Sequence, residues 1–251
     1  MTQRDYRILI GAAGWQHKEW GSEVFYPEDL PEDWYLSFYA NEFPVVLLPF
    51  ECWQDEIVGQ QTLDEISEQA RDGFRCLFEC SWKQDNSEQL LLQIKKLDQV
   101  SEHVAGLLIT TKIENLNNPL FAGFLASVQQ TYKVCLALKH QRLNAELSGD
   151  ETTADQESNS NFANVSDFCH QHNIALCWDG KDKIIVPDNA PLWVARCNSE
   201  QDKKALLLDL KTIIAGQLEH ESLLRDNVLI VDGSPPGVDA LRNANIMLDI
   251  M

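Results

Sequence analysis

The stretch that decides the fold reads FRCLFEC at residues 74–80, SEQLLLQIKKLDQV at residues 87–100 and GLLITT at residues 106–111. The first and last segments are short apolar runs of strand length, whereas the middle segment repeats leucine and isoleucine at helical spacing. A strand, a helix and a second strand in this order predict one βαβ unit of a parallel sheet.

The same alternation extends to both ends of the chain. Strands are predicted at residues 7–12, 45–48, 74–80, 106–111, 133–138, 174–178, 192–196 and 228–231. Helices are predicted at residues 31–40, 62–71, 87–100, 119–130, 162–172, 201–220 and 237–247. Eight such strands in 251 residues favour the α/β class, as a single (β/α)₈ TIM-type barrel domain over residues 1–251. The interval between the sixth and seventh strands is too short for a normal crossover helix, which predicts an irregular unit there.

Two local features carry their own predictions. Thr62, with Glu65 three residues later, predicts a capping box at the start of the helix over residues 62–71. Residues 148–161 are almost entirely polar, have nothing to bury and predict a mobile loop.

The composition limits the kinds of partner that the protein is expected to bind. The formal net charge of −19 repels phosphate backbones and anionic lipids, so we expect neither nucleic acid nor membrane as a partner. No apolar run is long enough to span a bilayer, and residues 1–7 lack the apolar stretch of a signal peptide. We therefore expect an acidic, soluble, cytoplasmic protein. A small-molecule ligand is compatible with this composition, and the oligomeric state stays open.

The seven cysteines predict reduced thiols in the core rather than a metal site. They are odd in number and widely spread, and most lie inside apolar runs. Cys76 and Cys80 lack the second pair that a zinc site requires. The glycine-rich fingerprints of dinucleotide and nucleoside triphosphate sites are also missing. The sequence therefore predicts no metal site and leaves the cofactor unknown.

In a barrel of this type, the active site lies at the carboxyl ends of the strands. The catalytic candidates at those positions are Glu79, Lys139, His140 and Asp179. The ligand-binding candidates are Trp15, His17, Trp20, Tyr26, Trp53, Trp82, Arg196 and Asp232.

Each group of candidates has two interpretations. Glu79, Asp179 and Asp232 could form a carboxylate cluster for a metal or for acid–base chemistry. Alternatively, Glu79 pairs with Lys112 or Lys139 across the barrel mouth. The aromatic residues of the strand-end loops either make a ligand-binding wall or cover the end of the core. The two histidines are either catalytic or simply solvated on the rim.

The opening of the chain is similar to that of a known family. The similar segments are Ile10-Gly11-Ala12-Ala13-Gly14-Trp15, Trp20, Phe25-Tyr26-Pro27, Leu30, Trp34, Leu36, Tyr39-Ala40 and Phe43. They resemble the opening of domain of unknown function 72 (YecE-like), which reads approximately I-G-T-S-G-W, W, F-Y-P, L, Y-A and F. Weaker similarity continues through the chain. The resemblance implies a TIM-type barrel, in agreement with the strand count, and it implies no particular reaction.

Several polar positions depart from the family pattern. In the family the second strand reads approximately T-V-E-I-N, whereas residues 44–48 of this chain are Pro-Val-Val-Leu-Leu. The family's third strand ends in Lys, whereas the matching residue of this chain is Glu79. The family's E-F-R-H in the fifth strand is Ala-Leu-Lys-His at residues 137–140. Arg196 matches the seventh strand only after a one-residue shift, and Asp232-Gly233 replaces paired asparagines in the eighth. These departures imply a remodelled pocket.

These observations lead to three hypotheses for function. The first is a YecE-like barrel whose remodelled, non-catalytic pocket binds a small polar metabolite. The second is a hydrolase or isomerase acting on a sugar or sugar phosphate. The third is a protein-interaction module that uses the acidic segment around residues 150–160.

Overall fold

The computed structural model describes residues 8–21, 23–139, 151–179, 184–198, 204–206, 208–209, 211–212 and 225–250, without the side chains of 151–161 and 249–250. Eight strands are described, in chain order: β1 Ile8–Ala13, β2 Val45–Leu48, β3 Arg75–Ser81, β4 Val104–Thr111, β5 Val134–Leu138, β6 Ala175–Leu176, β7 Leu192–Asn198 and β8 Asp226–Asp232.

The strands form one parallel sheet that is nearly closed. Their spatial order is β6-β5-β4-β3-β2-β1-β8-β7, so that β6 and β7 are the two edges. Trp178, just beyond β6, joins the edges: its N–H donates to Val194 O at 3.1 Å, and Arg196 N donates to Trp178 O at 2.7 Å. Within described residues 184–191, between β6 and β7, there is no helix. The predicted TIM-type barrel with an irregular unit at this point is therefore confirmed.

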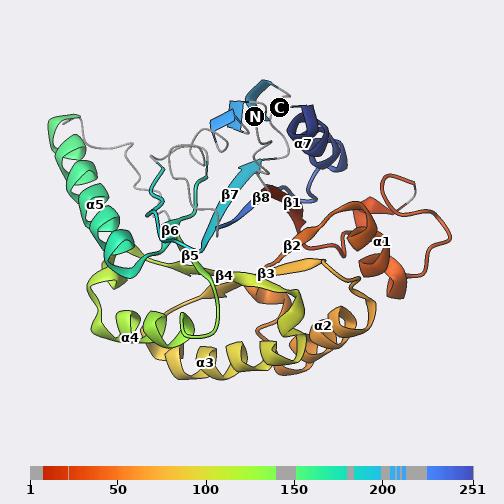
Figure 1. Ribbon diagram of the computed structural model, residues 1–251, viewed down its shortest axis with the longest axis horizontal. Helices are drawn as coiled ribbons and strands as arrows, with labels where there is room; N and C mark the ends of the chain where they lie inside the picture. The colour runs from red at the N-terminus through yellow and green to blue at the C-terminus, as the bar shows by residue number, and fades with distance from the viewer. Residues whose placement is uncertain are drawn as a thin grey trace, which may run out of the picture.

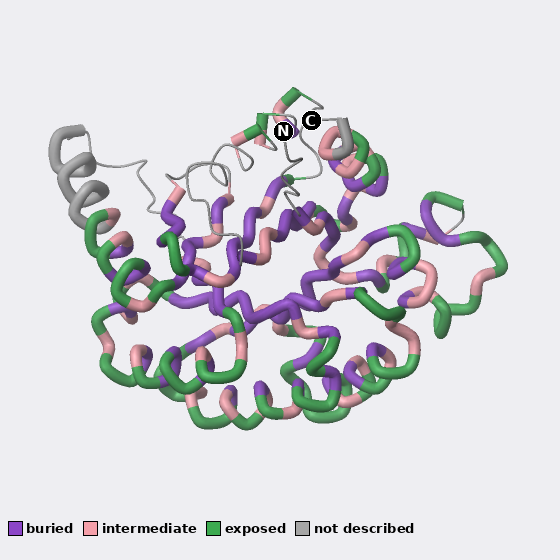
Figure 2. Tube along the Cα trace, in the orientation of Figure 1, coloured by how far each residue is buried: buried purple, intermediate pink, exposed green. Residues whose placement is uncertain are grey.

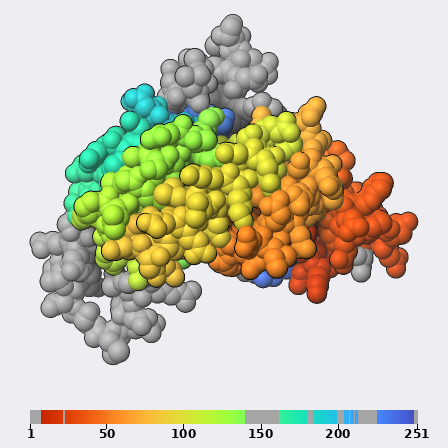
Figure 3. Space-filling view, turned by 90° about the horizontal axis from the view of Figure 1, so that it is seen from below, coloured from red at the N-terminus to blue at the C-terminus, as the bar shows by residue number. Residues whose placement is uncertain are grey.

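The helices lie outside the sheet (Figure 1). Those described are α1 Tyr35–Glu42, α2 Glu56–Gln69, α3 Ser87–Lys95, α4 Pro119–Val128, α5 Glu151–His172 and α7 Val238–Ile250. Buried residues follow the strands, and exposed residues follow the outer sides of the helices (Figure 2). Figure 3 shows the side chains of α2, α3 and α4 packed side by side over one flank of the barrel. Of the helix predicted at residues 201–220, the described pieces are 204–206, 208–209 and 211–212, all helical.

The predicted capping box at Thr62 is wrong. Helix α2 begins at Glu56, and the carboxylate of Asp55 caps it by accepting from Ile57 N at 2.9 Å and Val58 N at 3.1 Å. Thr62 lies inside the helix, where its hydroxyl donates to the carbonyl of Val58. The sequence pattern missed the first turn because its apolar residues, Ile57 and Val58, are exposed and do not continue the buried stripe of the helix. The carboxylate of Asp55 therefore supplies the capping acceptor that the sequence pattern assigned to Thr62.

The predicted loop at residues 148–161 is also wrong where the structure describes it, since residues 151–161 are helical. They extend α5 beyond the part that packs through buried Val165, Phe168 and Cys169. Extending an existing helix avoids the cost of nucleation. Residues 148–150 lie outside the described residues.

The hydroxyl of Tyr39 joins the backbones of β1 and β2. It accepts a hydrogen bond from Ala12 N at 2.8 Å and donates one to Val45 O at 2.9 Å, and the side chain is fully buried. Burial raises the pKa of this phenol, so it stays neutral and keeps its proton for the second bond.

We expect Tyr39→Phe to lower the free energy of unfolding by about 2 kcal/mol, because the change leaves two buried backbone groups without their partner. Urea unfolding followed by tryptophan fluorescence measures the loss. The matched control is Tyr35→Phe, whose hydroxyl has no hydrogen bond among the described residues and should cost less than about 0.5 kcal/mol. Equal losses in the two variants would show that the bridge contributes nothing.

Candidate functional site

Three charged residues from different strands meet at the carboxyl end of the barrel. Arg196 of β7 donates from Nε to Asp232 Oδ2 at 2.7 Å and from Nη2 to Asp232 Oδ1 at 2.9 Å. Its Nη1 lies 3.9 Å from Glu79 Oε1 of β3, an oxygen that also accepts from Thr110 Oγ1 at 3.0 Å. We call Glu79, Arg196 and Asp232 the mouth triad.

Strand register explains why these side chains converge. Paired Cα positions in neighbouring strands carry side chains on the same face, and alternate residues of one strand share a face. Glu79 pairs with Leu108, which places Thr110 on the same face, and Asn198 pairs with Asp232, which places Arg196 there too. Because β3 and β7 are not neighbours in the sheet, the contact between Glu79 and Arg196 must cross the barrel interior.

The triad holds one cation between two carboxylates in a half-buried setting. The side chains of Arg196, Asp232 and Glu79 are 30%, 29% and 20% exposed. Burial by itself would lower the pKa of Arg196, but the hydrogen bonds and charge of Asp232 raise it, with smaller contributions from Cys177 and Glu79, and the net shift is upward. Arg196 is therefore always charged, and its bidentate contact fixes its guanidinium plane.

The structure corrects two interpretations of Glu79. Among the described residues, the cation within 4 Å of Glu79 is Arg196, and neither Lys112 nor Lys139 reaches it. Glu79, Asp179 and Asp232 also do not gather into a group that could hold a metal ion, a statement that covers the described part of the chain. The physical reason is the same in both cases: Glu79 and Asp232 turn toward the guanidinium that lies between them.

A pocket of about 420 Å³ opens beside the triad. Its lining residues are Phe50, Glu51, Gln54, Glu79, Ser81, Lys83, Asn86, Gln89, Leu90, Gln93 and Lys139. Lys139, directly after β5, donates from Nζ to Ser81 Oγ at 2.9 Å. Glu79 thus belongs both to the triad and to the pocket wall, whereas His140 lies outside the described residues.

The aromatic candidates are buried and pack against other residues of the protein. Trp15, Trp20 and Tyr26 are at most 3% exposed. Tyr26 Oη donates to Trp15 O at 2.6 Å, and Trp20 Nε1 donates to Pro236 O at 2.8 Å. The His17 ring packs on Trp20, and its Nε2 lies 2.8 Å from Ala13 O. This packing favours the interpretation that they cover the end of the core, and their part in ligand binding stays a prediction.

Trp53 and Trp82 are also buried. Trp53 Nε1 donates to the carbonyl of Glu79 at 2.9 Å, and Trp82 Nε1 donates to Ser87 Oγ at 3.3 Å. Trp53 therefore fixes the backbone at the triad's glutamate, a supporting role that the sequence interpretation did not include. Ser81 and Thr110 were also missed as contacts, although the two-residue alternation along β3 and β4 places them on the face of Glu79.

All seven cysteines are free thiols, as predicted, but not all are in the core. Cys52 is exposed after β2 and Cys177 is half-buried, whereas the other five are buried. Burial raises the pKa of Cys197 to about 12, with Asp209 and Asp232 adding to the effect. Such a buried thiol is a packing residue rather than a nucleophile.

The protein is thus an α/β barrel that carries a charged cluster and a pocket at the carboxyl ends of its strands. The chain belongs to the family described as protein of unknown function DUF72, which it matches over residues 9–249. This confirms the resemblance seen at the opening of the sequence. Comparison with curated proteins gives no match. In the described part of the chain, every helix is too short or too polar to cross a membrane.

Two solved structures show distant similarity to this chain. A truncated 3-deoxy-D-arabino-heptulosonate 7-phosphate synthase from Thermotoga maritima is 13% identical, with a TM-score of 0.42 and coverage of 97% of this chain and 84% of that one. The citrate lyase beta subunit from M. tuberculosis, solved with oxaloacetate and magnesium, is 11% identical, with a TM-score of 0.35 and coverage of 83% and 90%.

Proposed function

We propose that this protein binds a small polar metabolite at the carboxyl end of its barrel. The observation that supports the proposal most strongly is the placement of Glu79. One of its oxygens, Oε1, is engaged by Thr110 and Arg196, while Oε2 has no hydrogen-bond partner among the described residues. The same side chain lines the pocket.

This arrangement suits recognition of hydroxyl or amino groups. A carboxylate that is already oriented loses little entropy when it accepts a hydrogen bond from a ligand. Arg196 and Thr110 hold Glu79 in place, and Asp232 holds Arg196. In this proposal Glu79 contacts the ligand, Arg196 and Asp232 position it, and the pocket residues supply further polar contacts. The pocket volume lies within the range of small-molecule sites.

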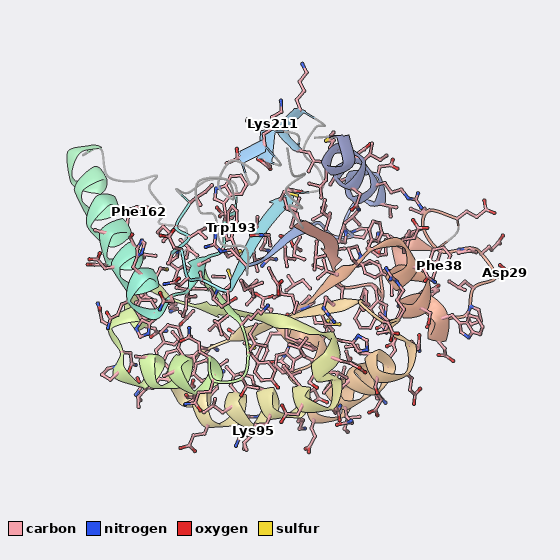
Figure 4. The ribbon with its side chains drawn as sticks, viewed as in Figure 1. Asp29, Phe38, Lys95, Phe162, Trp193 and Lys211 are labelled. Atoms are coloured by element: carbon pink, nitrogen blue, oxygen red, sulfur yellow. The ribbon has the colours of Figure 1, made fainter. Side chains whose placement is uncertain are left out.

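The test is a thermal-shift screen of sugars, sugar phosphates, amino sugars and carboxylic acids, followed by titration calorimetry of the hits. Glu79→Gln keeps the shape of the side chain but removes its charge, and we expect it to weaken a hit by about tenfold or more. The matched control is Asp29→Asn, an exposed carboxylate remote from the barrel mouth (Figure 4). A panel without hits, or a hit that Glu79→Gln leaves unchanged, would contradict the proposal.

A second candidate function, catalysis, is supported by an acid and a base that both line the pocket. Glu79 and Lys139 line the same pocket, so a carboxylate and an ammonium group face one ligand volume, as acid–base catalysis needs. A hydrolase or isomerase acting on a sugar or sugar phosphate would use this pair. Binding and turnover are separable: for an enzyme, we expect Lys139→Met to lower turnover more than affinity. Loss of affinity with no turnover in the parent protein would favour the binding function alone.

A further inference from the structure

The pocket holds two lysines that have no acidic partner among the described residues, in a protein rich in acid. The chain has 39 aspartates and glutamates against 20 lysines and arginines. Lys83 and Lys139 both line the pocket, yet neither has a carboxylate within 4 Å among the described residues. Lys139 Nζ donates to a neutral hydroxyl, that of Ser81. Glu51 and Glu79 also line the pocket, so the charges of its lining balance, whereas the whole chain carries a formal net charge of −19.

The backbone of both lysines is held by hydrogen bonds, although neither ammonium group has a carboxylate within 4 Å in the part of the chain that the structure describes. Lys139 N donates to Thr111 O at 2.8 Å, which continues the β4–β5 ladder by one residue. Lys83 N donates to Asn86 Oδ1 at 2.8 Å, and Asn86 Nδ2 donates to Ser81 O at 2.9 Å. The two stems therefore start from hydrogen-bonded backbone, Lys83 two residues after the end of β3 and Lys139 one residue after the end of β5.

From this geometry we infer that Lys83 and Lys139 form a subsite for the phosphate group of a phosphorylated hydroxyl compound. The inference rests on the proposed function, because it names the ligand class of the same pocket. A phosphate monoester carries close to two negative charges at neutral pH, which matches two ammonium groups, and lysine binds phosphate as a point charge. Ser81 adds a hydroxyl donor once its contact with Lys139 is exchanged.

The rest of the pocket fits the remainder of such a ligand. Its other polar lining groups are mainly amides, which both donate to and accept from hydroxyls, and Glu79 offers a carboxylate oxygen beyond them. The aromatic lining is limited to Phe50 among the residues described, because Trp53 and Trp82 are buried behind the wall. Recognition is therefore expected to depend on charge and hydrogen bonds, not on stacking against a base or a sugar face.

The experiment is calorimetric titration of the full chain with matched pairs of probes: ribose and ribose 5-phosphate, glucose and glucose 6-phosphate, and inorganic phosphate alone. We expect at least one ester to bind tenfold or more tightly than its parent sugar and than inorganic phosphate. Lys83→Gln and Lys139→Gln should each remove most of that preference, and raised salt should weaken the ester but not the sugar.

The control variant is Lys95→Gln, on the outer side of α3 and pointing away from the barrel (Figure 4). It should leave every affinity unchanged, and unliganded melting temperatures check that all three variants fold. If sugars bind as tightly as their esters, or if the pocket variants keep the preference, the phosphate subsite is wrong while the proposed function stands. Equal binding of inorganic phosphate and the esters would overturn the ester class. If no probe binds, both proposals lose their support.

Discussion

Gly11→Ala is expected to lower the free energy of unfolding by about 3 kcal/mol, because there is no space for a methyl group at this position. A Cβ on Gly11 would lie 1.8 Å from the carbonyl oxygen of Val45, which belongs to the neighbouring strand β2. That oxygen is a backbone atom and also accepts the Tyr39 hydroxyl, so it cannot turn aside as a flexible side chain would. The β1–β2 pairing would have to open instead.

The matched control for this variant is Gly123→Ala. Gly123 lies inside α4, and a Cβ there would meet no atom within 4 Å. Alanine in a helix interior is favoured over glycine by about 0.5–1 kcal/mol, so this variant should gain stability. Denaturant midpoints of the two variants give the comparison. A Gly11→Ala protein as stable as the parent would show that β1 and β2 are not as close as described.

Arg225→Met is expected to cost about 3 kcal/mol of unfolding free energy, because its guanidinium holds the connection between β6 and β7 against the start of β8. Arg225 is 8% exposed. Its Nε donates to Ala190 O at 2.9 Å, and its Nη2 donates to Pro187 O at 2.7 Å and Asp188 O at 3.1 Å. Methionine keeps the apolar stem but leaves three carbonyls without this donor.

The matched control is Arg242→Met on the exposed surface of α7, where the guanidinium carbon lies 5.9 Å from the centre of the Phe25 ring. An exposed cation–π contact is worth about 0.5–1 kcal/mol, so the loss should be correspondingly small. Chemical unfolding with both variants measures the difference. Similar midpoints for the two variants would mean that the β6–β7 connection needs no clamp from Arg225.

The hydrogen bonds of Arg225 are also expected to affect the position of the candidate site. Asp226 N donates to Pro191 O, and β7 then pairs with β8 from Leu192 to Asn198. The register set at this point carries through to Arg196 and Asp232 at the other end of the two strands. We therefore expect a change at Arg225 to disturb the mouth triad even though no side-chain contact joins them.

Local patterns predicted the elements because each pattern is confined to a short run of residues. Val45–Leu48 was predicted with its observed bounds, and the other strands differ from their predictions by a few residues at the ends. The errors in helices arose where the local pattern was incomplete. Ile57 and Val58 do not face the core, and the polar residues before 162 gave no sign that α5 continues through them.

The candidate residues were predicted from the rule that the active site of a barrel lies at the carboxyl ends of its strands. That rule does not predict which of these residues pair with one another. Arg196, Asp232 and Glu79 were all named from sequence, yet the partners considered for Glu79 were other carboxylates or lysines, not Arg196. Choosing between a lysine and an arginine requires the strand order and the register, since β3 and β7 lie far apart in the chain and approach one another only across the barrel.

The sequence by itself determined the alternation of strands and helices, and with it the barrel, because hydrophobic periodicity is a property of neighbouring residues. The tertiary structure decided which charged groups are paired, which aromatic rings are buried and which two lysines line the same pocket. Those facts depend on distances between side chains from separate strands. Such distances follow from barrel closure and register, and one residue of register would turn each of these side chains to the opposite face.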